Sequence, residues 1–303
     1  MNVELPESFK KIKTLLDTAY KNKLKSLKKI GFSKPVRLIT KSDILALQAD
    51  LIKNATAGYR KFFGISLVAQ AIKIEHALGL LETQSIVVLE KYWKKLREQA
   101  SGGNKAAKNL IKNKDISNAM WLTNSLFESG SRHPKIGRIC SIVDQQLRKK
   151  PNSMIIIFAN FRDSVKEIVS VLENVSGANP ISFVGQREGV TQKEQMKTLN
   201  DFKEGLYNVL VATSVGEEGI DIPDMDLAIF YEPVPSGIRA IQRRGRVGRT
   251  KIGKIIVLIT KNTRDEYYYW SAFHKERRMK NVLYDMKRGF GEKQADLRAP
   301  DTI

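Results

Sequence analysis

Residues 154–173 read MIIIFANFRDSVKEIVSVLE, and this stretch indicates the class of fold. Met154–Phe158 is a short, continuous apolar run of the length expected for a buried strand. Arg162–Glu173 then carries the pattern of a helix. Strands without polar alternation, when they alternate with helices, indicate a parallel sheet covered on both faces. The stretch therefore predicts an α/β fold for the part of the chain around it.

The same alternation continues along residues 131–303. Further apolar runs rich in β-branched residues are Ile181–Val184, Val209–Ala212, Leu227–Tyr231 and Ile255–Ile259. Further helices are predicted at Lys135–Arg148, Gln192–Phe202 and Ser236–Gln242, with a last one from Arg264 to Met286. In parallel sheets, ligands bind beyond the carboxyl ends of the strands. We therefore expect functional residues in the loops that begin at Ala159, Thr213 and Glu232.

Residues 1–130 have a helical pattern throughout. The segment Glu82–Ala100 shows it, because apolar residues recur there at three- and four-residue spacing and form one stripe, namely Ile86, Leu89, Trp93 and Leu96. Thr40–Asp43 has the residues of a helix start. We expect Trp93 and Trp121 in the core. The chain thus divides into an all-α domain, residues 1–130, and an α/β domain, residues 131–303.

The net charge is the most informative part of the composition. The chain carries +20 at pH 7 and has a pI near 9.9. An excess of this size favours a polyanionic partner, nucleic acid above an acidic membrane, although a merely basic surface gives the same number. Many of these charges share one amphipathic segment: Lys10, Lys11, Lys13, Lys21, Lys23, Lys25, Lys28 and Lys29. These lysines either form a solvated face or contact DNA.

Several classes of protein are disfavoured by the composition. Cys140 is the single cysteine, which excludes an internal disulfide and fits a reducing, cytoplasmic setting. Three scattered histidines add no set of metal ligands, so we expect no metal site. No apolar run approaches the roughly 18 to 20 residues that span a bilayer, and no secretory signal follows Met1. We therefore expect no membrane partner.

Gln242–Arg249 reads QRRGRVGR and concentrates positive charge. A packed core cannot hold four unpaired guanidinium groups, because each is costly to desolvate. Gly245 and Gly248 permit tight turns that can aim two arginines at one point. A planar, permanently charged fork suits a polyphosphate better than a lysine does. From the residues alone, a polyphosphate-binding loop and a general nucleic-acid contact are equally good interpretations.

Three segments resemble motifs of the superfamily-2 helicases. Gln242–Arg249 resembles motif VI, whose pattern is Q-x-x-G-R-x-x-R, and Ile155–Phe158 with Asn160 and Arg162 resembles motif IV. Motif V is matched by Val211–Thr213 followed by Gly216, Gly219, Ile220 and Asp221. More specifically, the archaeal Hef helicase and its Fanconi anaemia M-type relatives are similar to Phe183–Gln186, Ala212–Asp221, Phe230–Pro235 and Thr263–Trp270.

The resemblance implies a fold and a set of roles. Residues 131–303 would be a RecA-like second motor domain, and residues 1–130 the helical insertion that lies between the two motor domains of this family. In the family's pattern, Arg246 and Arg249 act as arginine fingers toward the γ-phosphate of ATP, and Gln242 links them to the nucleotide. By the same resemblance, Gly219 would pass close to the nucleotide and Asp221 would bind its ribose. Nucleic-acid phosphates would be held by Asn160, Arg162, Thr213 and Ser214.

The function implied is an ATP-dependent DNA helicase or translocase that acts on forked or branched DNA in repair or replication restart. ATP and Mg²⁺ would be held mainly by a first RecA-like domain of the same polypeptide, which this sequence lacks. Gly248–Lys254 has the glycine spacing of a phosphate-binding loop, but Ile255 replaces the required Ser or Thr and a strand follows. The chain alone should therefore be inactive. The alternatives are an ATP-independent nucleic-acid-binding module and a double-stranded-RNA motor of the Dicer type.

Overall fold

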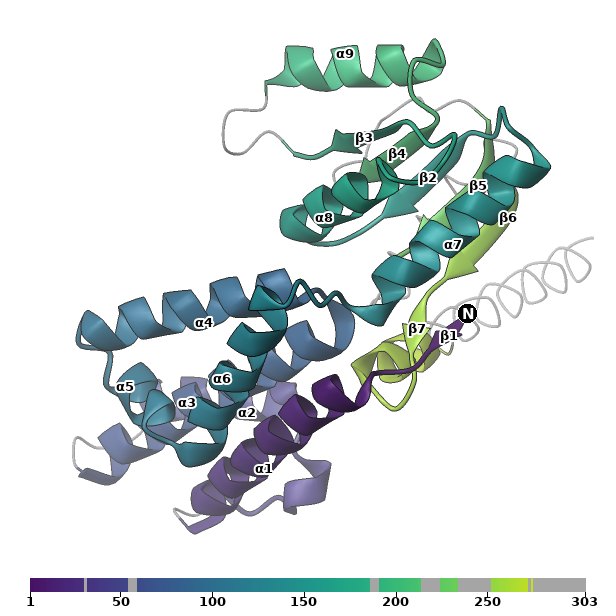
Figure 1. The fold of residues 1–303 in the computed structure, drawn as a ribbon. Helices are drawn as coiled ribbons and strands as arrows, with labels where there is room; N and C mark the ends of the chain where they lie inside the picture. The colour runs from purple at the N-terminus through teal and green to yellow at the C-terminus, as the bar shows by residue number, and fades with distance from the viewer. Residues whose placement is uncertain are drawn as a thin grey trace, which may run out of the picture.

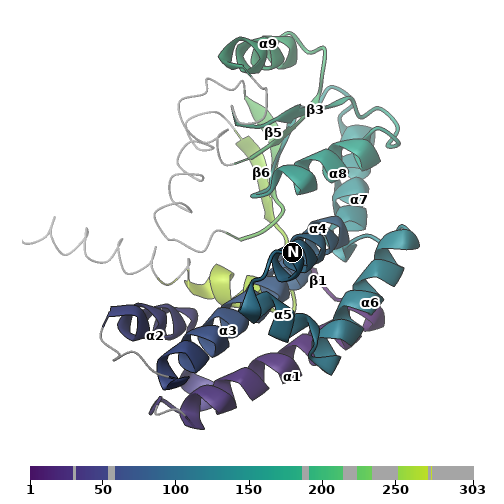
Figure 2. The ribbon, with the colours of Figure 1, turned by 90° about the vertical axis from the view of Figure 1, so that its left-hand side faces the viewer.

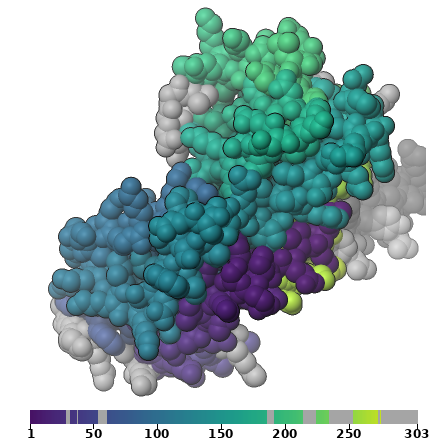
Figure 3. All heavy atoms as spheres, in the orientation of Figure 1, coloured from purple at the N-terminus to yellow at the C-terminus, as the bar shows by residue number. Residues whose placement is uncertain are grey.

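The computed structural model of the chain describes residues 1–29, 32–53, 59–185, 191–213, 224–233, 252–271 and 274. It contains two bodies, a bundle of helices and a sheet covered by helices (Figure 1). A view turned by 90° again shows the sheet above the bundle (Figure 2). In the space-filling view the two bodies are in contact (Figure 3).

The bundle forms the first half of the chain. Its helices are α1 (Glu7–Lys29), α2 (Lys41–Lys53), α3 (Tyr59–Thr83), α4 (Ile86–Ser101), α5 (Lys105–Ile111) and α6 (Lys114–Glu128), with a 3₁₀ turn, η1, at Val36–Leu38. The four stripe residues of α4 are all buried in the bundle core, namely Ile86, Leu89, Trp93 and Leu96. The predicted apolar stripe is therefore confirmed. Burial of each such aliphatic side chain contributes about 1.5–3 kcal/mol to folding.

Capping residues set the ends of these helices. Thr40 Oγ1 accepts a hydrogen bond from the backbone N–H of Asp43 at 3.3 Å, and Asp43 Oδ2 accepts from the N–H of Thr40 at 2.7 Å. The predicted helix start at Thr40 is confirmed. The segment Glu82–Ala100, predicted to be helical, includes the end of one helix and most of the next, because α3 runs on to Thr83 and the Ser85 side chain caps α4. Only Gln84 and Ser85 separate α3 from α4, so the apolar pattern of the sequence shows no gap at this break.

The two tryptophans of the bundle have different environments. Trp93 is fully buried and its Nε1 donates to Thr123 Oγ1 at 3.2 Å, as expected for a core residue. Trp121 on α6 is 69% exposed, so the prediction that it lies in the core is wrong. Helical phase gives the reason, because Ala119, Met120 and Thr123 occupy the buried positions of α6 around it. Trp121 lies on the outer face.

The length and hydropathy of helix α3 contradict the expectation that no apolar run is long enough to span a bilayer. Its segment Lys61–Thr83 has a mean hydropathy of 1.3 and is long and apolar enough, by length and composition, to cross a membrane. However, 61% of that window is buried inside the protein, where α3 packs against α1 and α2. The apolar side chains of α3 therefore serve the core of the bundle.

The second half forms a parallel sheet with helices on both faces, as predicted. Strands β2 (Ile155–Phe158), β3 (Pro180–Phe183), β4 (Val209–Ala212), β5 (Met225–Phe230) and β6 (Ile252–Val257) pair in the order β3-β4-β2-β5-β6. All four pairings are parallel. Helices α7 (Pro134–Lys149) and α8 (Arg162–Leu172) cover one face, and α9 (Gln192–Lys203) covers the other (Figure 1).

Alternate residues of β2 enter the two layers. Ile155 and Ile157 pack with α7 and α8, whereas Ile156 and Phe158 pack with α9. Because both faces are buried, the strand shows a continuous apolar run and no alternation with polar residues. This is the physical basis of the pattern in residues 154–158.

Two short strands were not predicted. The run Ile255–Ile259, expected as one strand, divides into β6 and β7 (Ile259–Thr260). Strand β7 pairs in parallel with β1 (Asn2–Val3), and Val3 joins the apolar core of the second half. The first residues of the chain, expected to be helical, therefore contribute to the α/β body. Strands of two residues are too short to show a period.

Candidate functional site

The carboxyl ends of β2, β4 and β5 lie side by side, and we call this place the carboxyl edge. Parallel pairing aligns the last residues of the three strands. The residues that follow them are therefore neighbours: Asn160 after β2, Thr213 after β4 and Glu232 after β5. This is the side of a parallel α/β sheet at which ligands bind.

Hydrogen bonds hold the loop between β2 and α8 at this edge. The backbone N–H of Asn160 donates to Oε1 of Glu232, whose side chain is buried. Arg162 is the first residue of α8, and its Nη2 donates to the carbonyl oxygen of Gly185 at 2.5 Å. The loop is thus tied to the segments after β5 and after β3.

The three predicted phosphate-binding residues that the structure describes come together here. Asn160 is exposed and Arg162 is half-buried. Thr213 is buried, and its backbone N–H donates to the carbonyl oxygen of Phe183 at 3.0 Å. Asn160 and Arg162 therefore present more surface to a ligand than Thr213 does.

The remaining predicted site residues lie outside the described residues: Ser214, Gly219, Asp221, Gln242, Arg246 and Arg249. The described chain stops after Thr213 and after Pro233, both at the carboxyl edge, and resumes at Asp224 and at Ile252. Thr213 and Pro233, the described residues that precede these segments, both lie at the edge that carries Asn160. The roles of these residues stay predictions.

A cleft of about 160 Å³ separates the carboxyl edge from α3 of the bundle. The α/β body contributes Asn160, Phe161, Glu232, Pro233, Asp265 and Tyr268 to its lining, and the bundle contributes Lys41, Glu75, His76, Gly79, Leu80, Thr83 and Gln84. The lining is mixed, with carboxylates, amides and aromatic rings. The bundle thus forms one wall of the candidate site.

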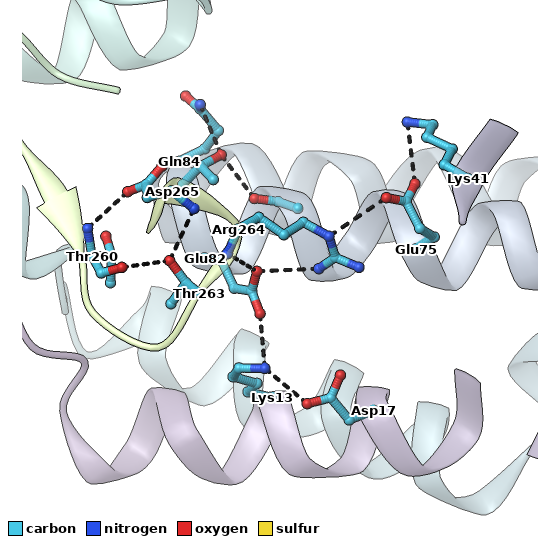
Figure 4. A network of polar contacts seen from close by, with 12 residues as sticks. Lys13, Asp17, Lys41, Glu75, Glu82, Gln84, Thr260, Thr263, Arg264 and Asp265 are labelled. Atoms are coloured by element: carbon cyan, nitrogen blue, oxygen red, sulfur yellow. Dashed lines mark hydrogen bonds and ion pairs between the residues drawn. The ribbon is translucent and has the colours of Figure 1, made fainter. Parts of the chain in front are cut away.

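Carboxylates of α3 join the bundle to the α/β body beside this cleft (Figure 4). Glu82 is buried; its Oε2 accepts from the backbone N–H of Arg264 at 2.9 Å and from Arg264 Nη1 at 3.2 Å. Its Oε1 lies 2.9 Å from Nζ of Lys13 on α1. Glu75 pairs with Arg264 and with Lys41, at 3.5 Å and 3.1 Å. Paired charges of this kind fix the two bodies relative to each other.

A fully buried ion pair lies at the same junction. Lys135 Nζ is 2.5 Å from Asp265 Oδ2, and both side chains are completely inaccessible. Asp265 also accepts from the backbone N–H of Thr260 at 3.0 Å, and the ammonium lies 5.0 Å from the ring centre of Tyr231. Lys135 is on α7 and Asp265 follows β7, so the pair joins the two ends of the α/β body.

Burial shifts the pKa values of Tyr231 and His133, which lie at this junction. It raises the pKa of Tyr231 well above the usual value, with nearby carboxylates adding to the shift. It lowers the pKa of His133 well below the usual value, helped by the charge of Lys135, so His133 is neutral in the folded state. The Nδ1 atom of His133 accepts from the backbone N–H of Lys135 at 3.3 Å and caps α7.

We predict that His133 makes the stability of the protein depend on pH. Its pKa is lowered on folding, so the unfolded chain binds more protons, and stability is lost as pH falls below about 6.5. The contribution has a slope of up to about 1.4 kcal/mol per pH unit. His133→Asn, which keeps a cap acceptor, should flatten the pH dependence of urea unfolding between pH 7.5 and 5.5.

His76→Asn is the matched control for this measurement. The pKa of His76 is also lowered by burial, but less, so this variant should remove only a minor part of the slope. An unchanged slope in His133→Asn would show that His133 is not the group that titrates.

The junction was missed by reasoning from the sequence. The sequence pattern assigns no role to Glu75, Glu82 or Asp265. A signal did exist, because Glu75 and Glu82 lie seven residues apart, about two turns, on one side of a long helix that is rich in apolar residues. Charges on a buried face need partners. The identity of the partners could not be read from the pattern.

Comparison with known families matches both bodies. The helicase conserved C-terminal domain matches residues 135–251, and the helical bundle of a putative ATP-dependent RNA helicase matches residues 8–128. The crystal structure of the Pyrococcus furiosus Hef helicase domain is 42% identical, with a TM-score of 0.76. The similarity covers 90% of this chain and 57% of that one.

Three curated relatives show the same relationship. A putative ATP-dependent RNA helicase of Methanocaldococcus jannaschii is 41% identical over 94% of this chain and 36% of that protein. The DEAD-box ATP-dependent RNA helicase FANCM of Arabidopsis thaliana is 36% identical over 67% of this chain and 15% of that protein. The ATP-dependent DNA helicase mph1 of Neurospora crassa is 32% identical over 69% and 19%. The chain spans about a third or less of these relatives.

The fold and these matches define the class of protein. The chain carries a RecA-like C-terminal helicase domain joined to a helicase helical bundle. Within that class, it closely matches the structure of the Hef helicase domain and has homologues named FANCM and Mph1 helicases. Both the fold class and the family predicted from the sequence are confirmed.

Proposed function

We propose that the chain is the C-terminal motor half of an ATP-dependent DNA helicase or translocase that acts on forked or branched DNA in repair or replication restart. One observation carries the proposal: the carboxyl edge groups Asn160 and Arg162, which belong to the segment resembling motif IV, with Thr213, which belongs to the segment resembling motif V. Contacts from such residues to phosphates fix position without reading sequence. The proposed location is cytoplasmic.

In this proposal ATP and Mg²⁺ bind mainly on a first RecA-like domain of the same polypeptide. Arg246 and Arg249 approach the γ-phosphate, and Gln242 links them to the nucleotide. Gly219 lies close to the nucleotide and Asp221 accepts a hydrogen bond from the ribose. Preorganised positive charge at a transferring phosphoryl group accelerates its transfer.

The bundle moves with this motor domain in the proposed cycle. Glu82, Glu75 and Gln84 of the bundle contact Arg264 and Ser164 of the α/β body, and the first two pair with charges. Separating the bodies would expose or unpair these buried groups, which is costly. Closure of the two motor domains around ATP therefore carries the bundle along and changes its position on DNA.

A double-stranded-RNA motor is the second candidate. The name of the M. jannaschii relative and the description of the matched bundle both refer to an RNA helicase, which favours this candidate. The relatives of the Mph1 type are named DNA helicases, which favours the first. An ATP-independent binding module is the third possibility, and it predicts no hydrolysis with any nucleic acid.

We predict that the chain binds forked DNA about tenfold more tightly than linear duplex of the same length, a difference of roughly 1.4 kcal/mol. The basis is the net charge of +20 together with a bundle fixed beside the carboxyl edge. Gel shifts at moderate salt with forked DNA, linear DNA and double-stranded RNA measure it. Equal affinities for fork and linear duplex remove the branched-DNA preference, and tightest binding to double-stranded RNA favours the Dicer-type motor.

A further inference from the structure

The outer surface of α5 and α6 carries positive charge without acidic partners. Over residues 105–121 the chain has four lysines and one carboxylate, Asp115, and all four lysines are exposed: Lys105, Lys108, Lys112 and Lys114. Within the described part of the chain, none of the four forms an ion pair.

Trp121 shares an exposed face of α6 with one of these lysines, Lys114. Lys114, Asn118 and Trp121 follow one another at four- and three-residue spacing on α6, so they share one face, and all three are exposed. Seven residues of helix place Trp121 about 10 Å from Lys114 along the axis. Among the described residues, the indole of Trp121 has no hydrogen bond and no ring contact. Burying a ring of this size would stabilise the fold, so its exposure on α6 forgoes that stabilisation.

We propose that this surface, Lys105 to Trp121, binds a single-stranded segment of nucleic acid, with the lysines at its phosphates and Trp121 stacked on a base. Surfaces that bind single strands combine basic residues with aromatic rings, and stacking accepts any base. A base inside a duplex is already stacked on both sides, so the exposed indole selects unpaired bases. Protein interfaces are depleted in lysine, which argues against a protein partner.

The proposal deepens the proposed function, and it rests on that function only in taking nucleic acid as the partner. The surface lies on α5 and α6, whereas the carboxyl edge faces α3 across the cleft. The α5–α6 surface would therefore hold one displaced arm of a fork while the carboxyl edge holds another part of the DNA.

Fluorescence anisotropy of the chain with labelled dT15 tests the proposal. Trp121→Ala should weaken binding by about 5- to 150-fold, the effect of one lost stacked base. Trp121→Phe keeps a ring and should retain most of the affinity. Lys108→Gln with Lys112→Gln should reduce the slope of log affinity against log salt by about 0.7 per lysine.

Phe127→Ala is the matched control. Phe127 is also exposed on α6, at 44%, but six residues from Trp121, on a different side of the helix. Its removal should leave the affinity unchanged. Binding of dT15 should also quench tryptophan fluorescence, and the quench should disappear in Trp121→Phe and persist in Trp270→Phe.

The outcomes separate this proposal from the proposed function. If Arg162→Ala weakens binding of dT15 and Trp121→Ala does not, the proposal that Trp121 stacks on a base is wrong, whereas the proposed nucleic-acid contact at the carboxyl edge is supported. If the chain binds no nucleic acid at all, both are wrong. Self-association that Trp121→Ala abolishes, with unchanged affinity for dT15, would assign Trp121 to a protein interface and overturn the proposal.

Discussion

Lys135→Met is expected to destabilise the protein by about 3–5 kcal/mol, because it leaves the Asp265 carboxylate buried without its cation. Both side chains are fully inaccessible, so water cannot replace the lost ammonium. Methionine fills a similar volume, and the loss therefore reports the missing charge and not a cavity. A change of this size lowers the melting temperature by on the order of 10 °C.

The double variant Lys135→Met with Asp265→Asn should recover most of this loss. Asparagine is neutral and still offers an oxygen to the backbone N–H of Thr260. Replacing both members of a buried ion pair by neutral groups is often close to neutral in free energy. A double variant as unstable as the single one would show that packing, and not charge, explains the effect.

Lys150→Met is the control for charge removal at an exposed site. Lys150 pairs with Asp226 at 2.6 Å, but its side chain is 59% exposed. Solvent screens such pairs, so this variant should cost less than about 1 kcal/mol. Urea unfolding of the three variants and the wild type at one pH provides the comparison.

The sheet could be predicted from the sequence because its strands are buried on both faces. Continuous runs such as Ile155–Phe158 are legible without knowledge of their neighbours. Strand β1 could not be predicted, because two residues carry no period and its partner β7 is more than 250 residues away. The exposure of Trp121 could not be predicted, because Met120 and Trp121 are adjacent apolar residues on α6 and the sequence does not show which of the two faces the core.

The junction could not be predicted because its partners are remote in sequence. Glu82 and Arg264 lie 182 residues apart, and only the folded chain brings them together. The sequence could predict that functional residues lie at the carboxyl edge, because Asn160 and Arg162 follow a strand and resemble a helicase motif. The roles of Asp221 and of the arginine segment rest on the resemblance alone, because those residues lie outside the described part.

Arg249→Ala in the full-length protein is expected to lower DNA-stimulated ATP hydrolysis by about 10³- to 10⁵-fold. A guanidinium group stabilises the charge that develops on the transferring phosphoryl group, and no neutral side chain replaces it. Arg249→Lys should also be strongly impaired, because an ammonium lacks the planar fork. DNA binding should change far less than hydrolysis, because this arginine is proposed to contact ATP.

Arg243→Ala is the matched control within the same segment. It removes an identical charge from Gln242–Arg249, at a position that the motif Q-x-x-G-R-x-x-R leaves free. Its rate should stay near that of the wild type. Equal losses in Arg243→Ala and Arg249→Ala would indicate a general electrostatic contribution of the segment and no specific finger.

The most direct measurement is the initial rate of ATP hydrolysis by the full-length protein on forked DNA, compared among wild type, Arg249→Ala and Arg243→Ala. A DNA-dependent rate in the wild type and in Arg243→Ala, lost in Arg249→Ala, is the predicted result. A near wild-type rate in Arg249→Ala, or a wild-type rate that forked DNA does not raise, would contradict the assignment of this chain as the ATP-sensing half of a DNA motor.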